Sequence, residues 1–149
     1  MFAQPKSRYS LVACLFAIVL LLSACSAATL DTPQGKLKVE SLEYLSRTGT
    51  FYANDPHRLV LTLTRSDNEM FSVDDLNYII HSGAYLTDSQ GKKYSIAREL
   101  EDATITDSQT DKFRLEFSGK PGEDRSFSLY WPDNSPLGIE REKHYMLDG

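Results

Sequence analysis

Cysteine is scarce in this chain. Only two of the 149 residues are cysteines, Cys14 and Cys25, and both lie near the N-terminus. The remaining sequence therefore has no disulfide, no thiolate metal site and no cysteine nucleophile. Small domains in oxidising compartments commonly carry disulfides, so a domain formed by this sequence must be stable through its hydrophobic core alone.

Basic clusters and catalytic motifs are also missing. Beyond Lys6 and Arg8 the chain has 14 basic and 21 acidic residues, a net charge of −7, and no run of basic side chains. Such a surface is a poor partner for nucleic acid or anionic lipid. The sequence contains neither a Gly-x-Ser-x-Gly nucleophile elbow nor a phosphate-binding glycine loop. We therefore expect no nucleic-acid partner, no cofactor and no enzymatic activity.

Candidate metal ligands are few and poorly spaced. His57, His81 and His144 are the only histidines, and none has a partner at the spacing typical of a zinc site. Carboxylates gather in residues 99–111, but their spacing matches no EF-hand loop. The intervening serines and threonines predict a solvated loop. We predict no metal site, although the sequence leaves open whether the 99–111 loop binds a cation.

The first 24 residues have the layout of an export signal. Lys6 and Arg8 precede an unbroken apolar run over residues 11–22, and two small residues follow it. A basic start, a short apolar stretch and a small-residue exit are the three parts of a secretory signal peptide. An uncleaved membrane anchor is the alternative, because residues 11–30 are long enough to span a bilayer, which takes about 20 largely apolar residues.

The residues Leu22-Ser23-Ala24-Cys25 resemble the bacterial lipobox, a leucine and two small residues before a cysteine. The resemblance implies cleavage before Cys25, diacylglycerol on its sulfur and a fatty acyl chain (palmitate) on the new amino group. Several acyl chains anchor a protein firmly in a membrane. Ser26 then implies delivery to the outer membrane, facing the periplasm, if the organism has two membranes.

Three segments follow from these features. Residues 1–24 are predicted to be the signal peptide, and residues 25–35 the lipidated cysteine with a flexible spacer of sequence SAATLDTPQG. Residues 36–149 have the size of a single domain.

Apolar residues alternate with polar ones in several stretches of the predicted domain, as half-buried strands require. The inward positions of these strands are Leu37 and Val39, then Leu59, Leu61 and Leu63, then Phe113, Leu115 and Phe117, and finally Phe127, Leu129 and Trp131. The last two strands are separated by a turn-rich connection over residues 118–124, which predicts that they pair as a hairpin.

Two local signals predict further structure. Asp88-Ser89-Gln90-Gly91 lies between two strand-like stretches, and Gly91 supplies the positive φ that a hairpin turn commonly needs. Ser72-Val73-Asp74-Asp75 has the spacing of a capping box, which favours a short helix over Val73–Ile80. The aromatic and β-branched residues at 78–80 also suit a strand.

Six to eight short strands predict an all-β fold, an antiparallel β-sandwich with room for one short helix; a small β-barrel is the alternative. The order of a DSQGKKY hairpin, an FRLEF strand, a glycine-proline turn and an FSLYW strand resembles immunoglobulin-like domains of unknown function in bacterial lipoproteins. The resemblance covers residues 59–139. It implies the sandwich and no particular activity.

Aromatic side chains suggest where a partner binds. Tyrosine and tryptophan favour binding surfaces because they combine a large contact area with a polar group. Trp131 has the inward parity of its strand, whereas Tyr130 has the outward parity and precedes a loop over residues 132–136. We predict that Tyr130, Asp133 and Asn134 form an interaction surface.

The leading hypothesis is a membrane-anchored envelope lipoprotein whose β-sandwich is a non-catalytic protein-interaction or assembly module, with an envelope protein as its partner. An inhibitor or immunity-type lipoprotein against a secreted or periplasmic enzyme is the alternative, because an acidic surface complements a basic enzyme. A glycan-binding module is a further alternative, supported by the tyrosines alone.

Overall fold

The computed structural model describes residues 28–46 and 55–141. The predicted signal peptide, Cys25 and His144 therefore lie outside the described residues. Within the described ranges, neither helix is both long and apolar enough to cross a membrane.

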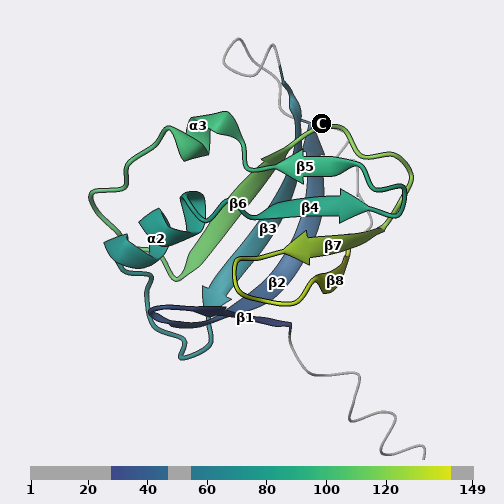
Figure 1. Ribbon diagram of the computed structural model, residues 1–149. Coiled ribbons are helices and arrows are strands. Elements are labelled where there is room, and N and C mark those ends of the chain that lie inside the picture. The colour runs from purple at the N-terminus through teal and green to yellow at the C-terminus, as the bar shows by residue number, and fades with distance from the viewer. Residues whose placement is uncertain (1–27, 47–54, 142–149) are drawn as a thin grey trace, which may run out of the picture.

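Eight strands form two four-stranded antiparallel sheets that pack face to face (Figure 1). Sheet A has the order β1(Thr29–Thr32), β2(Gly35–Ser46), β3(His57–Arg65) and β6(Lys112–Ser118). Sheet B has the order β5(Lys93–Ser95), β4(Tyr85–Asp88), β7(Ser126–Tyr130) and β8(Leu137–Glu140). The prediction of an all-β sandwich is confirmed.

The strand neighbours are those of an immunoglobulin-like sandwich. Strands β2, β3 and β6 correspond to strands A, B and E of that fold, and β5, β4, β7 and β8 to C′, C, F and G. Strand β1 is an addition at the edge of sheet A. The helix α2(Val73–Ile80) lies in the connection between the two sheets, and the short helix α3(Arg98–Glu101) stands where strand D is usually found.

Within the described residues, backbone pairing joins the two sheets along one edge. Ile96 forms a bridge to Phe117 directly after β5, and the Ala97 N–H donates to the Glu116 carbonyl at 2.8 Å. Among the described residues no pairing joins β1 to β8 on the other side. The sheets therefore do not close into the barrel that was the alternative.

The core lies between the sheets and follows the predicted alternation. The inward side chains of β3, Leu59, Leu61 and Leu63, are fully buried, and Trp131 at the end of β7 is 3 % exposed. Burial of each large apolar side chain contributes about 1.5–3 kcal/mol. This core is the main source of stability in a domain without cysteine.

Helix α2 begins where the sequence predicted. The Ser72 hydroxyl accepts from the Asp75 N–H at 3.0 Å, and the Asp75 carboxylate accepts from the Ser72 N–H at 2.8 Å. This reciprocal capping box satisfies N–H groups that the first helical turn leaves without partners. Arg65, the last residue of β3, adds an ion pair to the buried Asp75 at 2.7 Å. The pair fixes the start of the helix to sheet A.

The prediction that residues 113–117 and 127–131 form a hairpin is wrong. β6 pairs with β3, whereas β7 pairs with β4 and β8, so the chain crosses from one sheet to the other between them. Gly119 begins this crossing with a φ of +129°, and a Cβ atom there would lie 2.9 Å from the Tyr94 ring. The hairpin at residues 88–91 is confirmed, with Gly91 at a φ of +81°.

The predicted spacer is largely folded. Thr29–Thr32 form β1, paired with residues 35–38 of β2, and Leu30 is buried in the core. Sequence analysis missed this strand because only one of its side chains is a large apolar residue and the turn that follows contains proline and glycine. Sheet A therefore includes Thr29–Thr32, residues that were predicted to belong to the spacer.

Candidate interaction surface

The outer face of sheet B differs in composition from the rest of the domain surface. Its strands alternate, so one set of side chains points away from sheet A. This set contains two tyrosines and mostly small hydroxyl side chains: Tyr85, Thr87, Lys93, Ser95, Ser126, Ser128, Tyr130, Gly138 and Glu140. We call these residues the sheet B face.

The two tyrosines of the sheet B face form a stacked pair. Tyr85 of β4 lies directly opposite Tyr130 of β7, and their ring centroids are 4.7 Å apart with an interplanar angle of 7°. Both side chains are partly exposed. Lys93 of β5 places its Nζ atom 4.2 Å from the centroid of the Tyr85 ring. The stack is thus held rigid by a cross-strand partner and by a cation–π contact.

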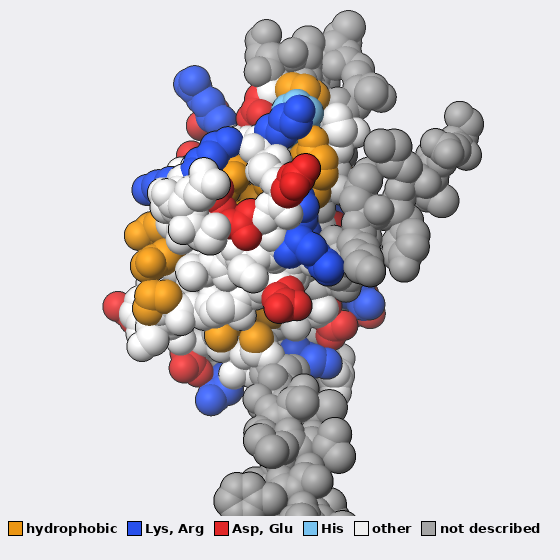
Figure 2. Space-filling model, turned by 90° about the vertical axis from the view of Figure 1, so that its right-hand side faces the viewer, with side chains coloured by type: hydrophobic (Ala, Val, Ile, Leu, Met, Phe, Trp, Pro, Cys, Tyr) orange, Lys and Arg blue, Asp and Glu red, His pale blue; other side chains and the backbone are white. Residues whose placement is uncertain are grey.

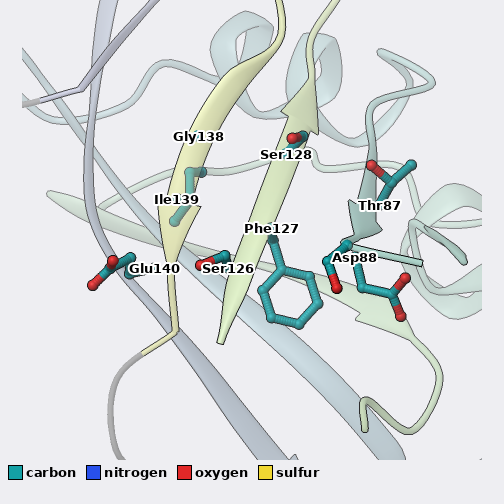
Figure 3. Close-up of a pocket in the computed structure, with 9 residues that line it drawn as sticks. Thr87, Asp88, Ser126, Phe127, Ser128, Gly138, Ile139 and Glu140 are labelled. Carbon is teal, nitrogen blue, oxygen red and sulfur yellow. The ribbon is translucent and has the colours of Figure 1, made fainter. Parts of the chain in front are cut away.

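A groove of about 510 Å³ crosses β4, β7 and β8, and its lining reaches Thr87 and Ser128, the outward positions next to Tyr85 and Tyr130 on their strands, without including either tyrosine. It is open because Ser126, Ser128 and Gly138 carry small side chains or none at positions where larger ones would fill the space. Figure 3 shows Ser126, Phe127 and Ser128 on the central strand, with Thr87 and Asp88 on one side and the β8 residues on the other. Only Asp88 and Glu140 bring charged groups to its lining.

The floor of the groove is braced by a hydrogen-bond network at the β4–β5 turn. Asp88 accepts from the Tyr94 hydroxyl at 3.0 Å and from the Gln90 N–H at 3.0 Å. Burial, reinforced by the hydrogen bond to Asp88, raises the pKa of Tyr94 to about 12. Asp124, from the loop after β6, accepts from the Ser89 N–H at 2.8 Å, and its hydrogen bonds with Ser89 lower its pKa.

A second hollow of about 550 Å³ lies on the far side of this network, between the β4–β5 turn and residues 120–124. The two hollows share Asp88 and Ser89 in their linings. Figure 2 shows the side of the molecule that carries this turn: uncharged polar side chains and backbone occupy its centre, with charged side chains of both signs around them. The second hollow itself is lined by charged residues of both signs, Asp88, Lys92, Lys120, Glu123 and Asp124, so this end of the groove opens toward a charged surface.

The structure separates the three residues that sequence analysis grouped. Tyr130 belongs to the sheet B face, but the Asn134 side chain turns toward sheet A, where it accepts from the Asp31 N–H at 3.5 Å and donates to the Asp31 carbonyl at 3.4 Å. Asp133 is exposed in the turn between them, with a φ of +61°. Asn134 thus acts as a clamp between the 132–136 loop and β1.

Sequence analysis missed Tyr85, Lys93 and the groove. The stacking of Tyr85 and the groove follow from the pairing of β7 with β4, which local patterns do not reveal, whereas the position of Lys93 follows from the β4–β5 hairpin. The outward parity of Tyr85 next to the predicted 88–91 turn was a usable signal once that pairing was known.

Other candidate ligands have structural roles. His57 Nδ1 lies 2.6 Å from the Tyr44 hydroxyl, and the backbone N–H of His81 caps the C-terminus of α2. The 99–111 segment is held against α2 by Asn77, whose amide donates to the Ile105 carbonyl at 2.9 Å and accepts from the Ile105 N–H at 3.0 Å. Within residues 28–46 and 55–141, no group of histidine, aspartate and glutamate side chains is arranged to hold a metal ion.

Arg58 is the most deeply buried charged side chain of the described residues, at 1 % exposure. Its guanidinium lies 2.8 Å from Asp55, 2.8 Å from Glu99 of α3 and 3.6 Å from Glu116. The three carboxylates come from separate segments, so this ion cluster joins α3 to sheet A.

Comparison with protein-family models found no match, and comparisons with curated proteins and with solved structures found no significant similarity.

Proposed function

We propose that the protein is an envelope lipoprotein, anchored through lipid on Cys25, whose sandwich is a non-catalytic module that binds another envelope protein through the sheet B face. In a two-membrane organism the predicted location is the outer membrane, on its periplasmic side. In this proposal the lipid anchor holds the domain at the membrane, and the sheet B face is its binding surface.

The stacked Tyr85–Tyr130 pair is the observation that carries this proposal. Residues that dominate protein–protein binding are enriched in tyrosine, tryptophan and arginine, and they lie in the centre of a contact area. A pair already ordered by stacking loses little side-chain freedom when a partner binds, which favours affinity. The adjacent groove offers space for a protruding side chain of the partner.

The hydroxyl lining of the groove favours a second candidate, a neutral glycan. Sugar hydroxyls pair well with serine, threonine and carboxylate oxygens, and a sugar ring packs on a tyrosine face. Thr87, Ser128 and Glu140 supply such oxygens in the lining of the groove. We rank this candidate second because the two tyrosine rings stack on each other and so cover one face of each.

The experiment is site-specific photocrosslinking in intact cells. A photoreactive amino acid replaces Thr87 or Ser128 in the groove, and Arg114 on the outer face of sheet A serves as the matched control. The same positions are tested in a Cys25→Ala protein, which lacks the proposed anchor. Crosslinked species are identified by mass spectrometry, and the Cys25→Ala protein is also co-sedimented with purified peptidoglycan.

One protein crosslinked from positions 87 and 128 but not from 114 is the expected result, and it should weaken when the anchor is removed. A partner captured equally well without the anchor would instead favour the inhibitor hypothesis, in which the target is soluble. Absence of any protein together with peptidoglycan binding that depends on Tyr130 would overturn the proposal in favour of a glycan.

A further inference from the structure

The position of β1 constrains how the domain stands on its membrane; this step depends on the proposed lipid at Cys25. Only Ser26, Ala27 and Ala28 separate Cys25 from Thr29, the first residue of β1. Four residues of fully extended chain reach at most about 14 Å. Thr29 must therefore lie within about 14 Å of the anchored cysteine.

Strand β1 cannot move away from the domain to lengthen this reach. All four of its residues pair with β2, and Leu30 is 1 % exposed in the core. The Val39 N–H donates to the Ala28 carbonyl at 2.8 Å, so the sheet holds the chain even one residue before the strand. Release of β1 would expose a core leucine, which costs about 2 kcal/mol, besides its hydrogen bonds.

Two loops are fixed to the same end of the sandwich. Asn134 clamps the 132–136 loop to β1 through Asp31, and the Ser66 N–H donates to the Lys36 carbonyl at 2.9 Å. The second contact places the 66–70 loop beside the β1–β2 turn. Met70 in that loop is 61 % exposed, the one large hydrophobic side chain so exposed among the described residues.

The opposite end of the sandwich carries α3. The ion pair between Arg58 and Glu99 holds α3 beside the start of β3, and β3 begins opposite Ser46, the last residue of β2. The 12 residues of β2 span about 36 Å at the usual rise per residue. Figure 1 shows β1 and α3 at opposite ends of the molecule.

We propose that the β1 end, made of β1, the β1–β2 turn, the 66–70 loop and the 132–136 loop, faces the lipid headgroups, while α3 points away from the membrane. An inverted domain would place Thr29 about 27 Å from the surface, because Thr29 is opposite Lys38, eight residues before the end of β2. A tether of about 14 Å does not reach that far.

The length of the tether, and not the charge of the β1 end, sets this orientation. The β1 end carries both signs, with Lys36 paired to Asp31 at 3.5 Å and Arg65 paired to Asp67 at 2.5 Å. Such a mixed surface has no net attraction for anionic lipid. Neutral phosphatidylcholine vesicles are therefore a sufficient test surface.

The test uses full-length lipidated protein extracted from cell membranes. Because Cys25 is acylated and Cys14 is removed with the signal, an introduced cysteine is the only free thiol of the mature chain. Gln34→Cys and Ser135→Cys place a fluorophore at the β1 end, and Glu101→Cys places one on α3. The labelled proteins are reconstituted into phosphatidylcholine vesicles that contain a headgroup spin-labelled lipid, and quenching is measured.

Labels at 34 and 135 should be quenched at least threefold more strongly than the label at 101. Insertion of ten glycine and serine residues between Ser26 and Ala27 should remove most of that difference, since the longer tether permits all orientations. Equal quenching at 34 and 101, or a difference unchanged by the insertion, overturns the inference. If the proteins do not float with the vesicles, the proposed lipid on Cys25 is absent. That result contradicts the proposed anchor and is distinct from equal quenching of bound protein.

Discussion

The outer faces of the two sheets carry different kinds of side chains. On sheet A, charged side chains pair with one another: Arg58 with Glu116, Arg114 with Glu43 at 3.6 Å, and Lys38 with Glu40 at 3.3 Å. On sheet B, most side chains are uncharged, and the tyrosines and hydroxyls leave a groove open. The comparison separates a face whose charged groups pair within the domain from a face whose hydroxyl groups line an open groove.

The largest expected effect is on sheet A. Arg58→Ala should lower the free energy of unfolding by about 3 kcal/mol, because it empties a fully buried position and leaves the largely buried Glu116 without this counter-charge. Urea unfolding followed by circular dichroism measures this. Arg114→Ala removes an arginine that is half-exposed on the same face, and it should change stability by less than about 0.5 kcal/mol. Equal effects of the two substitutions would contradict the structural role of the Arg58 cluster.

Tyr130→Ala tests the sheet B face. Loss of a central tyrosine should reduce partner capture about 30-fold, corresponding to about 2 kcal/mol. The cross-strand stack with Tyr85 is worth at most about 1 kcal/mol to folding, so the protein should remain folded. Quantitative pull-down of the identified partner measures the first effect and urea unfolding the second. Thr62→Ala on sheet A is the control, and a similar loss of capture there would remove the distinction between the faces.

Tyr94→Phe tests the network beneath the groove by its pH dependence. The folded state favours the neutral phenol, with a pKa near 12, whereas the unfolded chain titrates near 10. The stabilisation is therefore fully present below pH 10 and is lost as the pH rises toward 12. Wild type should lose stability over this range, and the Phe variant should lack that component while being about 1 kcal/mol less stable at neutral pH. Parallel alkaline profiles would refute the assignment.

Lys93→Gln should have the smallest effect. It removes the cation–π contact with Tyr85, which is worth about 0.5–1 kcal/mol at an exposed site. Partner capture should fall about threefold, and the free energy of unfolding measured in urea should fall by at most about 1 kcal/mol. Lys38→Gln alters a lysine of the other face and should leave capture unchanged. A loss of capture that is the same for both lysines would indicate a general effect of charge.

Local signals predicted local structure well. Helix α2 has the predicted bounds because its capping box is contained within four residues. The β4–β5 turn was predicted from a single glycine, and the inward parity of Trp131 from the alternation of its own strand. In each case the physical determinant lies within a few residues of the feature.

Features that depend on distant residues were not predictable in the same way. The β6 and β7 sequences alternate equally well, and nothing in either specifies β3 or β4 as its partner. Strand β1 depends on its pairing with β2, and α3 is only four residues long without a side-chain cap. The stacked tyrosine pair shows the same division, since the outward parity of Tyr130 follows from its own strand while its position opposite Tyr85 required the sheet order.

Gly119 has an evolutionary consequence. Its φ of +129° and the 2.9 Å approach of Tyr94 make any side chain at this position clash with that ring. Because this φ is strained for an L side chain whatever the neighbouring space, descendants of this chain should keep glycine at 119 even where position 94 carries a smaller residue.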